Sequence, residues 1–193
     1  MGIDPSRLDG PIVGIASTWT GTMPCNLGLR TLAHAVKQGI REAGGVPMEI
    51  NTIAISDGIT MGTEGMKTSL VSREVIADSV ELVASGHMFD AIIGLGACDK
   101  TLPGLSMALA RLNIPGFLIY GGTILPGEVD GKEATVRSVY EAIGGFDPPP
   151  MAMPHASGNG DSSCNVSGAP RSFGAIPIAG ALEVFALLPG PKR

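Results

Sequence analysis

The sequence predicts an α/β fold in which a parallel sheet carries helices on both faces, followed by an irregular C-terminal tail. Four short apolar runs alternate with three amphipathic segments of helical length, which is the pattern of strands joined by crossover helices. Only 4% of the 193 residues are aromatic, whereas 28 are glycine. The core is therefore expected to be aliphatic and the turns tight, which argues against an all-β fold.

The first strand and helix are predicted between residues 11 and 45. Residues 11–16 form an apolar run typical of a buried strand. Asn26 is expected to cap the following helix, and Gly44-Gly45 to end it. The apolar residues of this helix recur at helical spacing, at Leu29, Leu32, Val36 and Ile40. Such a one-sided helix is expected to cover one face of the sheet.

The same alternation continues to residue 120. Further strands are predicted at residues 49–55, 91–95 and 116–120, and helices at residues 72–84 and 103–112. Four strands separated by three helices predict right-handed crossovers in one parallel sheet.

The character of the chain changes at residue 146. The segment 147–193 is rich in proline and glycine and opens with three consecutive prolines, so we expect an atypical, mostly irregular tail. Only residues 175–188 in it have much apolar content. The predicted organisation is an α/β domain over residues 1–146 and this tail. The abrupt change is interpreted as a frameshift, an alternative end or a fragment.

Composition excludes several classes of partner. The formal net charge is −5, and no run of Lys and Arg is interleaved with aromatic residues, so nucleic acid is not an expected partner. No apolar stretch approaches the roughly 20 residues needed to cross a bilayer, and the N-terminus lacks the apolar core of a signal peptide. We therefore expect a cytoplasmic protein. Its three cysteines, Cys25, Cys98 and Cys164, suit free thiols or metal ligands better than disulfides.

The residues with chemical potential follow the predicted strands. In an open α/β sheet, ligands bind outside the carboxyl ends of the strands. Cys25 follows the first strand, Asp57 the second, and Cys98-Asp99-Lys100 the third. Two thiols, two carboxylates and a lysine are therefore expected to converge on one edge of the sheet.

These donors suggest two different metals side by side. Thiolates favour iron or zinc, whereas carboxylates favour magnesium. Two cysteines cannot close a zinc site, so an iron–sulfur cluster with a further ligand fits better. Each residue also has a simpler interpretation, because Cys98 could be a small buried apolar residue and Asp57 could turn the chain before Gly58.

Other candidates are less promising. The glycine-rich residues 58–66 contain neither the GxGxxG nor the GxxxxGK[ST] motif, although their backbone N–H groups could hold a substrate anion. Solvated charge is expected around the second helix, and the histidines show no partner pattern. These residues are Glu64, Lys67, Arg73, Glu74, Asp78, Glu81, His34, His87 and His155.

Several distinctive motifs stand out along the chain: PIVGIAS, the PCN at Cys25, the string NTIAISDGITMGTEGMKTSLVSREVIADSVEL, the CDK at Cys98 followed by PGLSMALARLNIP, and YGGTILPG. Together they resemble the family of dihydroxy-acid, phosphogluconate and sugar-acid dehydratases. The resemblance covers roughly residues 5–146. It implies a non-redox iron–sulfur hydro-lyase that converts a 2,3-dihydroxy acid to a 2-oxo acid and water in valine and isoleucine biosynthesis.

The resemblance also implies roles for individual residues. Cys25 and Cys98 would bind the cluster, and the cysteine in the PCN motif favours the two-iron two-sulfur type. Asp57 and Asp99 would bind Mg²⁺, and Lys100 would bind it as a carbamate formed with CO₂. A carbamate makes physical sense because it replaces a repelling ammonium with an anionic oxygen ligand.

The sequence also departs from the family pattern. Members are typically several times longer, and a second, β-rich domain supplies a further glutamate ligand and the serine base, so no catalytic base is expected in this chain. The context of Cys164 does not match the third cluster cysteine of the family. We expect a truncated form that is inactive alone, from a family of homodimers. The alternatives are a sugar-acid or phosphogluconate dehydratase, and a non-catalytic metal-binding fragment.

Overall fold

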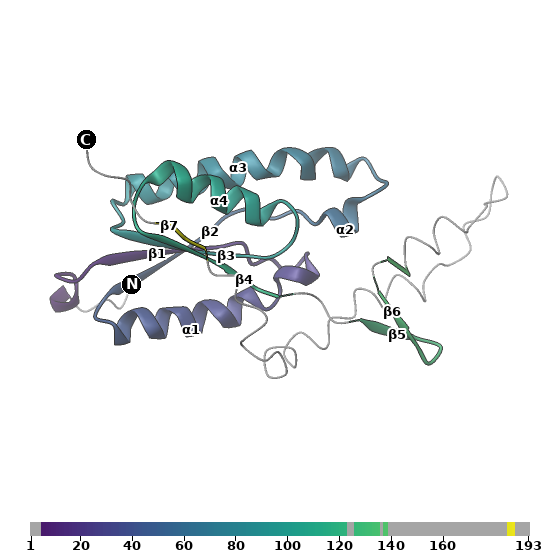
Figure 1. The fold of residues 1–193 in the computed structure, drawn as a ribbon, viewed down its shortest axis with the longest axis horizontal. Coiled ribbons are helices and arrows are strands. Elements are labelled where there is room, and N and C mark those ends of the chain that lie inside the picture. Colours follow the sequence, from purple (N-terminus) through teal and green to yellow (C-terminus); the bar gives the residue numbers. More distant parts are fainter. Residues whose placement is uncertain (1–4, 123–125, 136, 139–184, 188–193) are drawn as a thin grey trace. The chain divides into compact units, whose positions relative to one another are not determined.

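The computed structural model describes residues 5–122, 126–135, 137–138 and 185–187, drawn in colour in Figure 1. The chain divides into two compact units. The first contains the described residues up to 122 together with 185–187, and the second contains those between 126 and 138.

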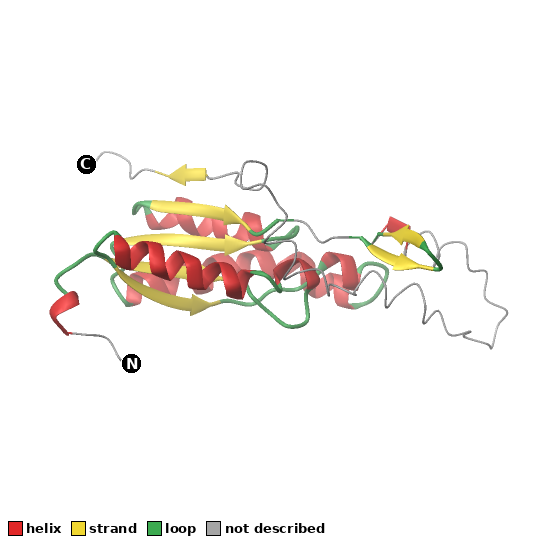
Figure 2. Ribbon diagram, turned by 90° about the horizontal axis from the view of Figure 1, so that it is seen from below, coloured by secondary structure: helices red, strands yellow, loops and turns green. Residues whose placement is uncertain are grey.

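The first unit is built on a five-stranded sheet in the order β2-β1-β3-β4-β7. The first four strands pair in parallel, as predicted, whereas β7 pairs antiparallel with β4. In Figure 2 the four neighbouring arrows point one way and the separate arrow points the other. Within the predicted irregular tail only β7 is described. The strands are β1 (Ile12–Ser17), β2 (Val46–Asn51), β3 (Ala91–Gly96), β4 (Gly116–Tyr120) and β7 (Phe185–Leu187).

Helices cover both faces of the sheet, which confirms the predicted fold class. Helix α1 (Leu29–Glu42) lies on one face, and α3 (Gly65–Gly86) and α4 (Thr101–Leu112) lie together on the other (Figure 1). None of the described helices has both the length and the apolar character needed to cross a membrane.

The core has two parts because successive strand residues point to opposite faces. In β1, Ile15 packs in the cluster that contains Leu29 of α1, whereas its neighbour Ala16 packs in the cluster that contains residues of α3 and α4. In β3, Leu95 belongs to the first cluster and Ile92 to the second. All these side chains are fully buried. The aliphatic core expected from the composition is therefore split by the sheet.

The start of α1 differs from the prediction, whereas its end agrees. Gly28, not Asn26, is the N-cap, and Asn26 lies in a short 3₁₀ helix, η2 (Pro24–Asn26). Asn26 does not cap because its side chain is buried and donates to Thr18 instead. At the other end, Gly44 has φ +83°, and the N–H groups of Gly44 and Gly45 bond to carbonyls of the last turn.

The segment between β2 and α3 is more helical than predicted. Residues predicted as a loop form a single turn, α2 (Asp57–Thr60), whose N-cap Ser56 accepts a hydrogen bond from the N–H of Ile59. Helix α3 then begins at Gly65 rather than at residue 72. The buried side of its first turns is polar, at Ser69 and Ser72, whereas Leu70 and Val71 are exposed, so the apolar periodicity did not detect this part of the helix. A further 3₁₀ turn, η1 (Pro5–Arg7), precedes β1.

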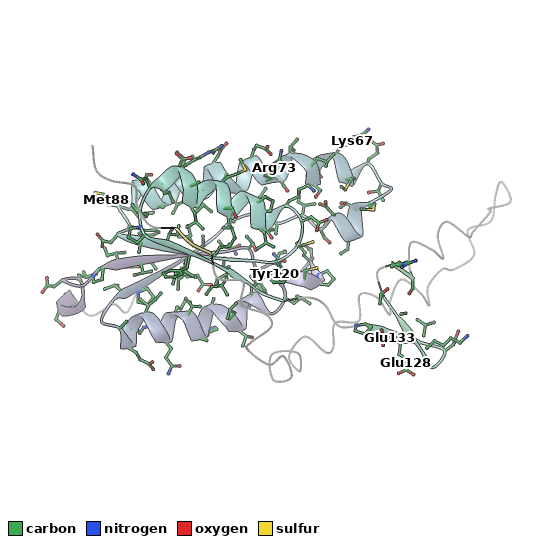
Figure 3. The ribbon with its side chains drawn as sticks, in the orientation of Figure 1. Lys67, Arg73, Met88, Tyr120, Glu128 and Glu133 are labelled. Carbon is green, nitrogen blue, oxygen red and sulfur yellow. The ribbon has the colours of Figure 1, made fainter. Side chains whose placement is uncertain are left out.

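The second unit contains a hairpin of β5 (Gly127–Val129) and β6 (Lys132–Ala134). Asp130 and Gly131 form its turn and both have positive φ, which matches the twist of the two strands. The labelled Glu128 and Glu133 in Figure 3 are partners across the hairpin.

Candidate metal-binding site

The strand order places the topological switch point of the sheet between β1 and β3. Strand β1 lies between β2 and β3, so the chain moves to one side of β1 after the first strand and to the other side after the second. The helices that follow β1 and β3 cover opposite faces of the sheet. Such a reversal is where doubly wound sheets bind ligands. The loops that leave β1 and β3 carry Cys25 and Cys98.

The structure brings the two cysteines together, as predicted. Both are free thiols of intermediate exposure, and their side chains hydrogen-bond to each other. The hydrogen bond from Cys25 lowers the pKa of Cys98 from 9.0 to about 7, against the opposing effect of burial. The same contact and burial raise the pKa of Cys25. Cys98 is therefore the more acidic thiol of the pair.

Cys98 has an unusual backbone conformation. Its φ is 78°, in the left-handed region that residues other than glycine rarely adopt. This conformation costs on the order of 1–3 kcal/mol unless surrounding contacts impose it. Cys98 lies two residues after the end of β3 and two residues before Lys100, the N-cap of α4, which begins at Thr101. The turn therefore bends the chain sharply at the residue that presents the second thiol.

Asp57 and Lys100 form a buried ion pair in the same unit. The Lys100 ammonium nitrogen lies 2.6 Å from Asp57 Oδ2, and the two side chains are 17% and 4% exposed. The other oxygen, Oδ1, accepts a hydrogen bond from the buried hydroxyl of Ser69 in α3. Both oxygens of the Asp57 carboxylate are therefore held, one by α3 and one by the loop after β3.

Asp99 completes the predicted set. Its residue is exposed, and its side chain lies beside the carboxyl group of Asp57. Burial alone would raise the pKa of Asp57, but hydrogen bonds from Lys100 and Ser69, the charge of Lys100 and the contact with Asp99 together lower it below 3.8. Asp57 is therefore an anion at neutral pH, with a cation already beside it.

The donor types fit the predicted metals, whereas their number is incomplete. The thiol pair suits a soft metal such as iron, and the two carboxylates suit a hard cation such as Mg²⁺. Among the residues that the structure describes, no three His, Cys, Asp or Glu side chains are grouped so as to hold one metal ion. The five predicted residues thus form two adjacent pairs of ligands plus a lysine. Cys164 lies outside the described residues.

The charges of α3 lie outside this site, as expected. Lys67 pairs with Glu64, and Arg73 with Glu74, on the outer side of the helix (Figure 3). Arg111 of α4 pairs with two acidic residues of α3, Asp78 and Glu81. Of the histidines, His34 is exposed and His87 stacks on Phe89 at 6.0 Å, whereas His155 lies outside the described residues.

An open pocket of about 520 Å³ lies at the carboxyl ends of β1 and β2. Its walls include Trp19 and Ile53, and the hydroxyls of Thr52 and Ser79, which lie 2.6 Å apart. The guanidinium of Arg30 lies 4.8 Å from the centre of the Trp19 ring, at the outer side of the loop after β1. None of these residues was predicted to belong to a site, because aromatic and hydroxyl side chains after a strand have no distinctive spacing.

Comparison with known proteins finds one family along most of the chain. The model described as "Dihydroxy-acid/6-phosphogluconate dehydratase N-terminal" matches residues 10–175. This match extends past residue 146, where the resemblance found in the sequence ended.

Curated relatives show the same similarity. A dihydroxy-acid dehydratase of Roseiflexus castenholzii is 54% identical over 190 residues, which is 98% of this chain and 34% of the relative. Proteins of the same name from Koribacter versatilis and Thermus thermophilus are 62% and 54% identical, over 74% and 75% of this chain. The chain thus spans about a third or less of the length of these relatives.

Proposed function

Because the chain belongs to the dihydroxy-acid/6-phosphogluconate dehydratase family, within the N-terminal region of that family, we propose that it supplies the metal-binding half of a hydro-lyase active site. The observation that carries the proposal is the contact between the Cys25 and Cys98 thiols at the switch point of the sheet. Two thiols in contact at the strand ends are suitable ligands for a soft metal centre.

In this proposal Cys25 and Cys98 bind an iron–sulfur cluster, of the two-iron two-sulfur type. Asp57 and Asp99 bind Mg²⁺. The two bound groups would supply Lewis acids that polarise a hydroxyl group and hold a carboxylate. The pairing of soft and hard ligands on neighbouring loops supports this division of roles.

Lys100 determines the net charge around Asp57 and Asp99, the two proposed Mg²⁺ ligands. As an ammonium it neutralises Asp57 across 2.6 Å, and it would repel a divalent cation placed there. Carbamylation by CO₂ would exchange this cation for a carboxylate-like group in the same position. Lys100 would then add an anionic oxygen beside Asp57 and Asp99, which together suit Mg²⁺.

The proposed substrate is a 2,3-dihydroxy acid. The relatives named above are dihydroxy-acid dehydratases. In the proposed reaction the C2–H and C3–OH bonds break, water leaves, and the resulting enol becomes a 2-oxo acid. This reaction would serve the synthesis of valine and isoleucine, in the cytoplasm and in a homodimer. The family description also names 6-phosphogluconate, so a sugar acid remains the second candidate.

The test is anaerobic reconstitution of the purified chain with iron and sulfide. We expect the wild-type chain to bind iron and sulfide with the absorption of a cluster, and we expect Cys25→Ala and Cys98→Ala to lose it. The matched control is Cys164→Ser, which should retain the cluster if Cys164 is not a ligand. Equal iron in wild type and both alanine variants would contradict the proposal.

A further inference from the structure

Two polar side chains are completely buried between the loops that carry the cysteines. Thr18 is the residue after β1, and Asn26 follows Cys25 in η2. Both are 0% exposed. Buried polar groups are retained only where hydrogen bonds compensate for the loss of water.

The contacts of this pair connect the loop that carries Cys25 to β3, the strand that leads to Cys98. The Thr18 hydroxyl donates to the carbonyl of Leu95 in β3 at 2.9 Å, and the Thr18 N–H donates to the same carbonyl at 3.0 Å. The amide nitrogen of Asn26 donates to the Thr18 carbonyl at 2.7 Å and to the Thr18 hydroxyl oxygen at 2.8 Å. A continuous chain of hydrogen bonds therefore runs from β3, three residues before Cys98, to the residue next to Cys25.

The Asn26 amide is committed to this chain in one orientation. Its two N–H groups meet two acceptors on Thr18, whereas no donor among the described residues reaches its buried Oδ1. The side chain cannot be turned over without placing an oxygen against the Thr18 carbonyl. Asn26 therefore acts in this network as a hydrogen-bond donor.

We propose that Thr18 and Asn26 are positioning residues that fix the Cys25 thiol opposite the Cys98 thiol. The inference rests on the proposed role of the two cysteines as ligands. The 3₁₀ turn that carries Cys25 is only three residues long, and its N-cap, Met23, makes no side-chain cap, so its own restraint comes from the backbone bonds of Asn26 to Met23 and of Leu27 to Pro24. The Asn26–Thr18–Leu95 hydrogen bonds further restrain the position of Cys25, because they connect its turn to β3, the strand that leads to Cys98.

The test measures binding of Cd²⁺ alone, a soft probe of thiol pairs, to the full 193-residue chain. All variants carry Cys164→Ser, so that only two thiols remain. Thr18→Val removes the hydroxyl and keeps the shape, and Asn26→Leu removes both donors without adding charge. Thr18→Ser restores the hydroxyl. The matched control is Thr52→Val, which removes a buried hydroxyl that bonds to Ser79 of α3 and leaves the Thr52 N–H bond to the Ser17 carbonyl in place.

We expect Thr18→Val and Asn26→Leu to weaken Cd²⁺ binding by about tenfold or more, the loss typical of residues that orient metal ligands. Thr18→Ser and Thr52→Val should bind within about twofold of the reference chain. Urea unfolding of every variant separates this effect from stability. If Thr52→Val loses as much Cd²⁺ affinity as Thr18→Val at an equal loss of stability, Thr18 and Asn26 have only a structural role and the inference is overturned.

A Cys25→Ala arm distinguishes the two levels of the argument. If it abolishes tight Cd²⁺ binding while Thr18→Val and Asn26→Leu bind normally, the positioning role fails and the thiol site stands. If Cys25→Ala binds as tightly as the reference chain, the thiol pair is not a site, and both the proposed function and the positioning role are overturned. If Asn26→Leu does not fold, the comparison of Cd²⁺ affinity between Thr18→Val and Thr18→Ser tests the positioning role by itself.

Discussion

Cys98 is the more acidic thiol of the cysteine pair, although the two thiols are in contact. The hydrogen bond from Cys25 lowers the pKa of Cys98 to about 7, and the same contact raises that of Cys25. Because the thiolate is the reactive form, reactivity at neutral pH should be concentrated on one residue of the pair.

This asymmetry predicts selective alkylation in the metal-free chain. The rate at which iodoacetamide modifies Cys98 should rise as the pH increases through about 7, while Cys25 stays unmodified until more alkaline pH. In Cys25→Ala the rise should move to higher pH, because the hydrogen bond that lowers the pKa is lost. Peptide mass spectrometry at a series of pH values measures both rates. Faster labelling of Cys25 than of Cys98 at neutral pH would contradict the assignment.

Asp57 links the site to acid stability. Its pKa is lowered in the folded state, so its pairing stabilises the fold above 3.8, and this contribution is lost as the pH falls from 3.8 through the folded pKa. We expect Asp57→Asn to unfold more readily than wild type at neutral pH, with a difference that shrinks in strong acid. Asp78→Asn, which alters an exposed ion pair, is the control and should change stability little.

Urea unfolding curves recorded by circular dichroism at each pH give the free energy of unfolding of both proteins. A difference between wild type and Asp57→Asn that stays constant from neutral pH to below the folded pKa would show that the carboxylate charge does not stabilise the fold.

Helices α3 and α4 approach each other closely at Gly104. A Cβ atom at this position would lie 2.8 Å from the backbone oxygen of Arg73 and equally close to the Ile76 side chain. Backbone cannot move aside as a flexible side chain can. The absence of a side chain at Gly104 therefore sets how closely the two helices pack over the sheet.

Gly104→Ala is expected to destabilise the chain by about 1–3 kcal/mol, as overpacking of a core does. Gly86→Ala is the matched control, since a Cβ there meets nothing within 4 Å and the change should be neutral or stabilising by up to about 1 kcal/mol. Urea unfolding gives both values. Equal effects of the two substitutions would show that helix propensity, not the approach of α3, determines the outcome.

Elements with strong apolar patterns could be predicted from the sequence. The strands β1, β3 and β4 and the helix α4 agree with their predicted ranges to within two residues. The failures have physical causes. The turn α2 and the start of α3 were missed because they depend on the Ser56 cap and on the Ser69–Asp57 contact. Polar contacts of this kind leave no apolar periodicity in the sequence. Strand β2 begins three residues earlier than predicted because its pairing with β1 sets its limits.

The candidate site could be predicted as a set of residues but not as a geometry. Parallel strands bring their carboxyl ends together, so the convergence of Cys25, Asp57 and Cys98 followed from topology. The direct contact of the thiols, the left-handed Cys98 and the hydrogen bonds of Asn26 did not follow, because they depend on side-chain packing between segments far apart in the sequence.

The whole chain is expected to bind metals without completing the reaction. It carries the proposed metal ligands, it spans about a third or less of the length of its relatives, and none of its described residues is assigned as the base that takes the C2 proton. We expect the reconstituted chain to produce no 2-oxo acid from a 2,3-dihydroxy acid, whereas a full-length relative prepared in parallel does. A colorimetric assay of the 2-oxo acid tests this, and measurable turnover by the chain alone would contradict it.

The central position of β1 has a consequence for the order of events during synthesis. Strand β1 is made first, yet one of its two partners, β3, is made only after α1, β2 and α3. Contacts between distant parts of a chain form late, and domains fold as units while they emerge from the ribosome. The thiols of Cys25 and Cys98 therefore cannot meet until the first half of the chain has been translated and docked. If the proposed cluster were delivered earlier it would meet a single cysteine, so its loading would follow folding of the sheet.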